Sequence, residues 1–592
     1  MEKSGKSGNF KAFAAVPALL LVLPLFSYPL LWKKLFSANQ PLWGEVLAVS
    51  PSVLGFAAFG AICLAPQARF RRLWETPRLR IFLLFAVAGV FSAALQQALY
   101  GGPFHYIGTA GFFFLLPVAG ILYSSAFKRL FPLFLALLFL PVLLVTVRTP
   151  DLSGWAGNWN WNFSLLAVTA SGGLFLFFRR SVKKGMWWGL GIVTGALVIV
   201  SCLRPELLPR GTFAGIAGSV VCLLVFRNIS PRRRWAFALW ATALTLVLFI
   251  GAVGNIFDRI RDSRFQLWRG SWECVLANFP LGIGFDRFES MINAYLPEIY
   301  YFTPFAAPRH PHSHNEFLNY AASYGLVGAV FFVLLALLVL RGMRWSDRSG
   351  LWLSWVVLML GIHGQFDVLL SVPLTGTLFL LGAGAVAGNG MTGNAPRSRG
   401  FLSGVKAFAG CAVFAGTIIF AVNCGKSGYY FRNARLDLFR KDIASAEMNL
   451  QKSLKYHIWP NQLYICGAVS LFNFRNPDLC ISYLERIQSE LGLPMVYHSN
   501  LLLARSYAAK KEYAKSLNYF DEELKYYPLS ALASGLRLSV LHLAEAGEKV
   551  ISEEKTRFEV LMKMRGLGKD DLPELIRNQQ LDDAPLKTRD DE

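Results

Sequence analysis

A short segment near the middle of the chain joins a histidine to a spaced pair of glycines. His314 and Asn315 are followed by nine residues and then by Gly325 and Gly328. An imidazole, with a pKa of about 6.5, can accept the proton of an attacking hydroxyl or orient that hydroxyl. The glycines and Ala321 lie close to one face of a helix, where small residues allow close packing. The pattern predicts a rigidly held general base, although an isolated histidine at this place also suits a simple helix cap.

Two arginine-containing segments supply positive charge. Arg264 opens a short amphipathic helix that leads to the turn 280–284 and should lie at a membrane interface. Arg210 opens an apolar run, and Arg204 lies shortly before it. Guanidinium groups bind phosphate oxygens through paired hydrogen bonds, so they can neutralise a developing negative charge in place of a metal ion. The apolar side of the amphipathic helix is expected to carry Trp268, Trp272, Val275 and Leu276.

Further residues around these segments are candidates for substrate contact. They are Arg204, Arg269, His312 and Asn315. Arg269 suits contact with anionic lipid headgroups equally well, and Arg204 or Arg210 can simply extend to the membrane surface. The predicted outer loops contain no clustered acidic motif typical of a divalent ion site. We therefore predict neither a metal ion nor a cofactor.

The elements that position these residues are apolar helices. The chain has 592 residues, of which 54% are hydrophobic and 16% charged, the balance of an integral membrane protein. Uncharged runs such as 12–32, 46–66, 81–100 and 235–254 have the length of about 20 residues that crosses a bilayer as a helix. We count about thirteen such spans before residue 425.

The basic residues indicate the orientation of these spans. The net charge of +22 would suggest nucleic acid on a soluble domain, but here the basic residues gather in alternate connections between spans. The positive-inside rule then places the N-terminus in the cytoplasm, and we predict no nucleic-acid partner. Three segments then face outward. They are the long loop 255–315, the connection 204–211, and the C-terminal segment that follows the last span (407–424). All the candidate chemistry falls on that face.

A different pattern begins at residue 425. Helical periodicity with a repeat near 34 residues indicates tetratricopeptide-like units, which present concave surfaces to protein partners. The best copy is 496–528, and Ala434 and Gly467 mark weaker copies. Cys466 and Cys480 can form a disulfide if this part is extracytoplasmic, although the sequence leaves their pairing open.

The histidine and arginine segments together resemble the O-antigen ligase superfamily, which also includes O-antigen polymerases and bacterial protein O-oligosaccharyltransferases. The histidine motif matches at all its defined positions, and Arg264 precedes a tryptophan-containing helix as in that family. Family ligases often have a leucine four residues after the other arginine. That spacing fits Arg204, followed by Leu208, whereas the helix-start position favours Arg210. The resemblance covers roughly residues 200–390.

This resemblance implies an all-α, polytopic membrane enzyme similar to the glycosyltransferase C superfamily, followed by a helical repeat domain. It implies His314, Arg264 and Arg210 as catalytic residues in a bacterial inner-membrane protein. The enzyme would take a glycan from a polyprenyl-diphosphate carrier in the bilayer and transfer it on the periplasmic side, with inversion and without metal. The acceptor stays open: lipid A core for a ligase, a growing glycan for a polymerase, or a protein hydroxyl for a protein transferase.

A polysaccharide transporter or flippase is the alternative from another class. Coupled transporters commonly bury ionisable groups along their path, whereas these spans are nearly free of them. His363 and Asp367, toward the outward end of the eleventh span, are the main exceptions, and we expect them to line the same cavity or to pair with each other.

We divide the chain into five segments. They are N-terminal transmembrane helices (1–200), a catalytic core (201–390), a linker with the last transmembrane helix (391–424), a repeat domain (425–570) and a polar tail (571–592).

Overall fold

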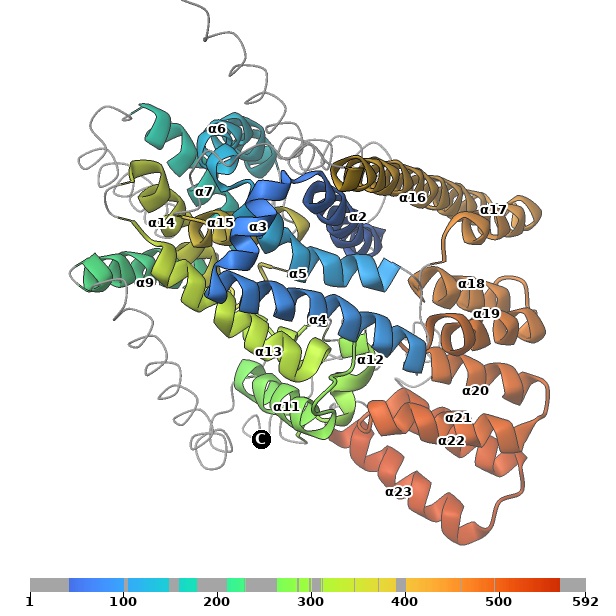
Figure 1. The fold of residues 1–592 in the computed structure, drawn as a ribbon. Coiled ribbons are helices and arrows are strands. Elements are labelled where there is room, and N and C mark those ends of the chain that lie inside the picture. Colours follow the sequence, from blue (N-terminus) through green and yellow to red (C-terminus); the bar gives the residue numbers. More distant parts are fainter. Residues whose placement is uncertain are drawn as a thin grey trace, which may run out of the picture.

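The structure is a computed structural model. It describes residues 42–100, 105–148, 159–177, 210–227, 229, 263–284, 287–297, 300, 310, 312–344, 347–370, 372–389, 401–458, 460–493 and 496–564. Throughout these ranges the regular elements are helices, which confirms the predicted all-α class (Figure 1). The predicted spans 12–32 and 235–254, together with Arg204 and the tail 571–592, lie outside the described residues.

Apolar helices form the larger part of the molecule. They are α2 (Leu42–Leu64), α4 (Pro77–Tyr100), α5 (His105–Leu122), α6 (Ser124–Arg148), α7 (Trp159–Phe177), α9 (Arg210–Arg227), α13 (Glu316–Gly342), α14 (Arg348–His363), α15 (Pro373–Ala387) and α16 (Phe401–Phe439). The short helix α3 (Gln67–Glu75), which contains three arginines, follows α2. Among the described residues, four helices are long and apolar enough to cross a membrane, and α2 with α3, bent by 97°, makes a fifth candidate. Several shorter apolar helices accompany them. The chain is a polytopic helical membrane protein.

Aromatic side chains join α5 to α13 at the centre of this domain. The rings of Phe114 and Tyr324 lie 4.9 Å apart, and those of Phe113 and Tyr320 lie 5.1 Å apart, both in edge-to-face arrangements. All four residues are buried. Such pairs add to the free energy gained from burial alone and hold α13 firmly against its neighbour.

Helix α13 is broken at Gly325. Its φ of 58° and ψ of −141° fall in a region that is essentially restricted to glycine. A Cβ atom at this position would lie 1.9 Å from the Pro280 carbonyl oxygen. The expectation that Ala321, Gly325 and Gly328 share one face of a regular helix is therefore wrong. Gly325 allows a close approach of another backbone segment, and Gly328 passes close to the Tyr320 carbonyl of its own helix.

The turn 280–284 fills this break. The backbone N–H groups of Ile283 and Gly284 donate to the carbonyls of Ala322 and Ser323, each at 2.9 Å. Backbone groups freed inside an apolar helix must find other partners, and this turn provides them. The break thus ties the loop that follows Arg264 to the helix that follows His314.

The C-terminal part is a stack of shorter helices. They are α17 (Ile443–Tyr456), α18 (Pro460–Phe472), α19 (Pro477–Leu491), α20 (Ser499–Ala509), α21 (Tyr513–Tyr526), α22 (Ala531–Leu543) and α23 (Glu548–Met564). The best repeat copy, 496–528, coincides with α20 and α21, while its assignment to the tetratricopeptide class stays a prediction. Cys466 and Cys480 are buried thiols that form no disulfide here.

Helix α16 connects the two parts without interruption. The expected end of the last span, at residue 424, falls inside this helix, which continues to Phe439. Phe431 and Ala434 near its end are buried in the same core as Leu463 of α18 and Leu484 of α19. The membrane helix therefore supplies the first helix of the C-terminal stack, as its course across Figure 1 shows.

The break in α13 predicts a sensitive position. Gly325→Ala should destabilise the folded protein by ~1–3 kcal/mol, because alanine is strained at this φ and its Cβ would collide with Pro280. The measurement is thermal unfolding of the purified protein in nanodiscs. Gly404→Ala in α16, where a Cβ meets nothing within 4 Å, is the matched control and should leave the melting temperature unchanged or slightly raised. Equal melting temperatures for Gly325→Ala and the wild type would contradict the proposed role of the break.

Candidate active site

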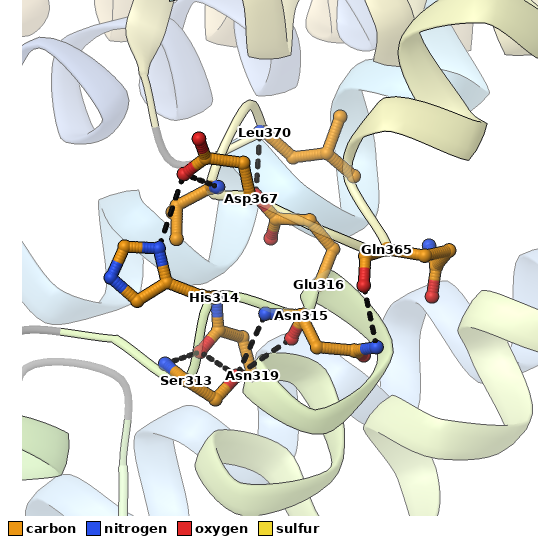
Figure 2. A network of polar contacts seen from close by, with 9 residues as sticks. Ser313, His314, Asn315, Glu316, Asn319, Gln365, Asp367 and Leu370 are labelled. Carbon is orange, nitrogen blue, oxygen red and sulfur yellow. Dashed lines mark hydrogen bonds and ion pairs between the residues drawn. The ribbon is translucent and has the colours of Figure 1, made fainter. Parts of the chain in front are cut away.

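Two loops meet at the histidine motif, one preceding α13 and the other following α14. The Glu316 N–H donates to the Gly364 carbonyl at 2.8 Å, and its carboxylate accepts from the Leu370 N–H at 2.6 Å. The Asn315 side chain donates to the Gln365 carbonyl at 3.0 Å (Figure 2). Glu316 is fully buried. These bonds fix the two loops against each other.

The His314 ring lies between the loops. Its Nδ1 is 3.2 Å from Oδ1 of Asp367, which also accepts from the Val368 N–H at 2.8 Å. The side chain of Asp367 is 5% exposed and that of His314 is 31% exposed. Figure 2 shows the other ring nitrogen of His314 pointing away from Asp367 and the labelled network. An Nδ1–H donated to the carboxylate leaves Nε2 free to accept a proton.

His363 and Asp367 were expected to line the same cavity or to pair with each other; their side chains do not pair, and the shared cavity stays a prediction. Asp367 pairs with His314, whereas Nδ1 of His363 lies 2.6 Å from the Ser164 hydroxyl of α7. The backbone explains the difference, since α14 ends at His363 and the chain turns before it reaches Asp367. The turn carries the carboxylate toward the loop before α13.

Asn315 begins α13 as its N-cap. Its Oδ1 accepts from the Leu318 N–H at 3.0 Å, while its amide nitrogen donates to Gln365. Both ends of the side chain are thus engaged in holding the helix and the loop. Asn319 one turn later accepts from the Ser313 N–H at 2.8 Å and secures the residue before His314. A direct contact of Asn315 with substrate stays a prediction.

His312 packs beside His314. Their ring centroids are 4.7 Å apart and perpendicular, and the Trp161 ring of α7 lies on another side at 6.3 Å. Burial, together with the neighbouring His314 and His310, lowers the pKa of His312 despite the opposing charge of Asp367. Among the described residues its buried Nδ1 has no hydrogen-bond partner. His312 is therefore neutral at physiological pH, and its contact with substrate stays a prediction.

The segments that carry the predicted arginines approach His363. Arg264 is an exposed residue of α11 (Ser263–Ala277), and its charge interacts with His363. Arg210 is the first residue of α9, and a Cβ on its neighbour Gly211 would lie 2.2 Å from His363 Nε2. The structure therefore brings the start of α9 and the start of α11 to one place. Arg269 lies on α11, where its Nε is 3.2 Å from Glu273.

Only part of the predicted apolar side of α11 is buried within the protein. Leu276 is 58% exposed, and Trp268 and Trp272 are only partly buried. The buried residues are Gln266, Leu267, Gly270, Ser271, Cys274 and Val275. Helix α11 packs on the small residue Ala322 of α13, so this tertiary contact decides which side is buried.

Sequence reasoning missed the partners that orient the histidine. The pairing of Asp367 with His314 joins residues 53 positions apart in the chain, which no local pattern shows. The available signal was the presence of a carboxylate in an otherwise apolar span. Glu316, directly beside the motif, was likewise not recognised as the link to Leu370.

Residues 206–333 match the model of a protein family described as O-antigen ligase. Over this segment the chain is similar to the O-antigen ligase family. The matched segment contains Arg210, Arg264 and His314, whereas Arg204 precedes it and Asp367 follows it. No curated protein matches the chain.

The half-buried His312, whose Nδ1 is buried, predicts a pH dependence of stability. Between its lowered folded pKa and about 6.5, the unfolded histidine binds a proton that the folded one does not, so stability falls as pH falls, by up to ~1.4 kcal/mol per pH unit. His312→Gln should therefore lose less stability than the wild type between pH 7.5 and 5. Thermal unfolding at several pH values measures this. The exposed His542→Gln serves as control and should follow the wild type; an unchanged slope in His312→Gln would refute the assignment.

Proposed function

We propose that the protein transfers a glycan from a polyprenyl-diphosphate carrier to an acceptor hydroxyl at the outer face of the bacterial inner membrane. The observation that carries this proposal is the His314–Asp367 pair, placed beside the starts of α9 and α11 with their arginines. A base held by a carboxylate suits activation of a hydroxyl. The family match supports the same class of membrane protein.

In the proposed reaction, His314 acts on the acceptor. The acceptor hydroxyl donates to Nε2 of His314 and attacks the anomeric carbon of the donor sugar. A new C–O bond forms as the bond to the diphosphate oxygen breaks, and the hydroxyl proton passes to Nε2. Asp367 stabilises the resulting imidazolium through Nδ1. Attack opposite the leaving group inverts the anomeric carbon.

The arginines act on the leaving group. Negative charge develops on the diphosphate as the glycosidic bond breaks, and guanidinium groups neutralise it through charge-assisted hydrogen bonds. We assign this role to Arg264 and Arg210. Arg264 is exposed, and Arg210 stands at a helix N-terminus, where the helix dipole also favours an anion. Arg204 stays the competitor of Arg210.

The donor is proposed to enter from the bilayer. Leu276 and Phe279 at the end of α11 are 58% and 60% exposed, so this end of the helix offers an apolar surface. Such a surface suits the membrane interface, where the polyprenyl chain of a carrier lies in the hydrocarbon and its diphosphate at the surface. The N-terminus is then cytoplasmic, and the site and C-terminal stack are periplasmic.

The acceptor we put first is lipid A core, with a growing glycan or a protein hydroxyl as alternatives. One observation favours a role for the C-terminal stack in choosing it. The Arg287 guanidinium, in the outer loop after α11, donates to the Gly492 carbonyl at the end of α19. A partner or acceptor bound on the stack is thereby close to the outer loop.

Substitution of the proposed catalytic residues tests the mechanism. His314→Ala, Arg264→Ala and Arg210→Ala should each abolish measurable transfer from a labelled lipid-linked donor, and Asp367→Asn should lower the rate about a hundredfold or more, because it no longer orients the base. Arg204→Ala assayed beside Arg210→Ala shows which arginine matters more. Arg71→Ala, an exposed arginine paired with Glu75 on α3, is the control and should retain activity. Transfer at the wild-type rate by purified His314→Ala, Arg264→Ala and Arg210→Ala would contradict the proposal.

Deletion of the gene tests the acceptor. A ligase predicts loss of capped lipopolysaccharide with retained lipid-linked polymer, because the glycan is made but not transferred. A polymerase predicts chains of a single repeat, and a protein transferase predicts the loss of a set of glycoproteins. Gel and mass-spectrometric analysis of the three glycan pools distinguishes them. Unchanged glycans in all three pools would count against transfer altogether.

A further inference from the structure

His363 is a buried histidine that the proposed reaction does not use. It is the last residue of α14 and is fully buried, so its side chain does not reach substrate. Yet it lies where the arginine-bearing helices and the loop of Asp367 meet. The contacts on each side of the ring show what it holds.

On the Nδ1 side, His363 joins two other helices. Its Nδ1 lies 2.6 Å from the Ser164 hydroxyl of α7, and that hydroxyl lies 2.9 Å from the Thr212 hydroxyl of α9. All three side chains are fully buried. Hydrogen bonds among buried polar groups are costly to lose. These two hydrogen bonds therefore fix the first turn of α9 against α7 and α14.

On the Nε2 side, the ring rests on a glycine. A Cβ on Gly211 would lie 2.2 Å from Nε2 and 2.3 Å from Cδ2 of His363. One turn later, a Cβ on Gly215 would lie 2.6 Å from the Met359 carbonyl oxygen. Glycines spaced in this way let α9 and α14 approach at backbone distance. Within the described part of the chain, Nε2 has no hydrogen-bond partner, which accords with a ring edge packed against a Cα atom.

The backbone of His363 carries the other half of the site. Its carbonyl accepts from the N–H groups of Phe366 at 2.9 Å and Asp367 at 3.1 Å. The turn that these bonds close delivers the Asp367 carboxylate to His314. The side chain of His363 thus contacts Gly211, and its backbone carbonyl holds the turn that contains Asp367.

We infer that His363 is a positioning residue, which aligns the Arg210-bearing start of α9 with the His314–Asp367 pair so that Arg210 reaches the donor diphosphate. This inference rests on the proposed function. A histidine that serves only the core would alter stability alone. A positioning residue alters the affinity for a diphosphate, and its effect requires Arg210.

The test uses the full-length protein in nanodiscs and measures binding of undecaprenyl diphosphate. Gly211→Ala should weaken binding about tenfold or more, because its Cβ collides with the His363 ring and displaces α9; losing one charge-assisted contact has an effect of this size. His363→Ala should weaken binding to a similar degree. His363→Asn, whose amide can bond to Ser164, should retain most of the affinity. Gly173→Ala in α7, where a Cβ meets nothing within 4 Å, is the matched glycine control.

Two combinations separate positioning from general damage. Gly211→Ala with His363→Ala should bind better than Gly211→Ala alone, because the smaller side chain makes room for the new methyl group. Arg210→Ala with His363→Ala should bind no more weakly than Arg210→Ala alone. Multiplied losses in this second pair would overturn the inference, since His363 would then act independently of Arg210.

The same measurements distinguish the inference from the function beneath it. If Arg210→Ala and Arg264→Ala bind undecaprenyl diphosphate as the wild type does, the proposed diphosphate site itself is wrong. If both lose affinity while His363→Ala and Gly211→Ala do not, the positioning role alone is overturned. Size-exclusion profiles and melting temperatures identify variants that fail to fold. If His363→Ala does not fold, His363→Asn is compared with the wild type and with Arg210→Ala instead.

Discussion

The backbone hydrogen bonds at the break in α13 are the interactions on which the rest of the site depends. An apolar helix that spans a membrane cannot leave its carbonyls without partners, because hydrocarbon offers none. The turn after α11 supplies N–H groups to Ala322 and Ser323, and the side chain of Gln96 in α4 donates to Ser323 as well, at 2.9 Å. Through these bonds the segment that begins at Arg264 is joined to the helix that begins beside His314. Two regions of different sequence thereby share one rigid frame.

Within that frame the charges have separate tasks. Asp367 is buried and paired with His314, which alone of the pair is substantially exposed. His312 adds a neutral aromatic surface beside it, since burial keeps the ring unprotonated. The positive charges come from arginines, which stay charged whatever their surroundings.

The sequence predicted the helical class, because this follows from local composition. The outer location of the candidate residues and the catalytic role of His314 stay predictions. The sequence did not predict the role of Gly325, because the residue type alone does not distinguish a glycine that breaks a helix from a glycine that allows close helix packing. The residues that α11 buries within the protein were not predicted, because packing on α13 decides them; Leu276 of the predicted apolar side is exposed. Asp367 was singled out, but its pairing with His314 was not predicted because the two residues are distant in sequence.

The uninterrupted helix α16 links the protein to the thickness of its bilayer. Its 39 residues extend for about 58 Å, roughly twice the ~30 Å of hydrocarbon in a typical membrane. A helix of this kind answers hydrophobic mismatch by tilting. Because its last turns belong to the core of the C-terminal stack, any tilt carries the stack with it, while the contact of Arg287 with Gly492 holds the opposite edge to the outer loop. We therefore expect bilayer thickness to affect how the stack lies relative to the candidate site without any direct contact of lipid with either.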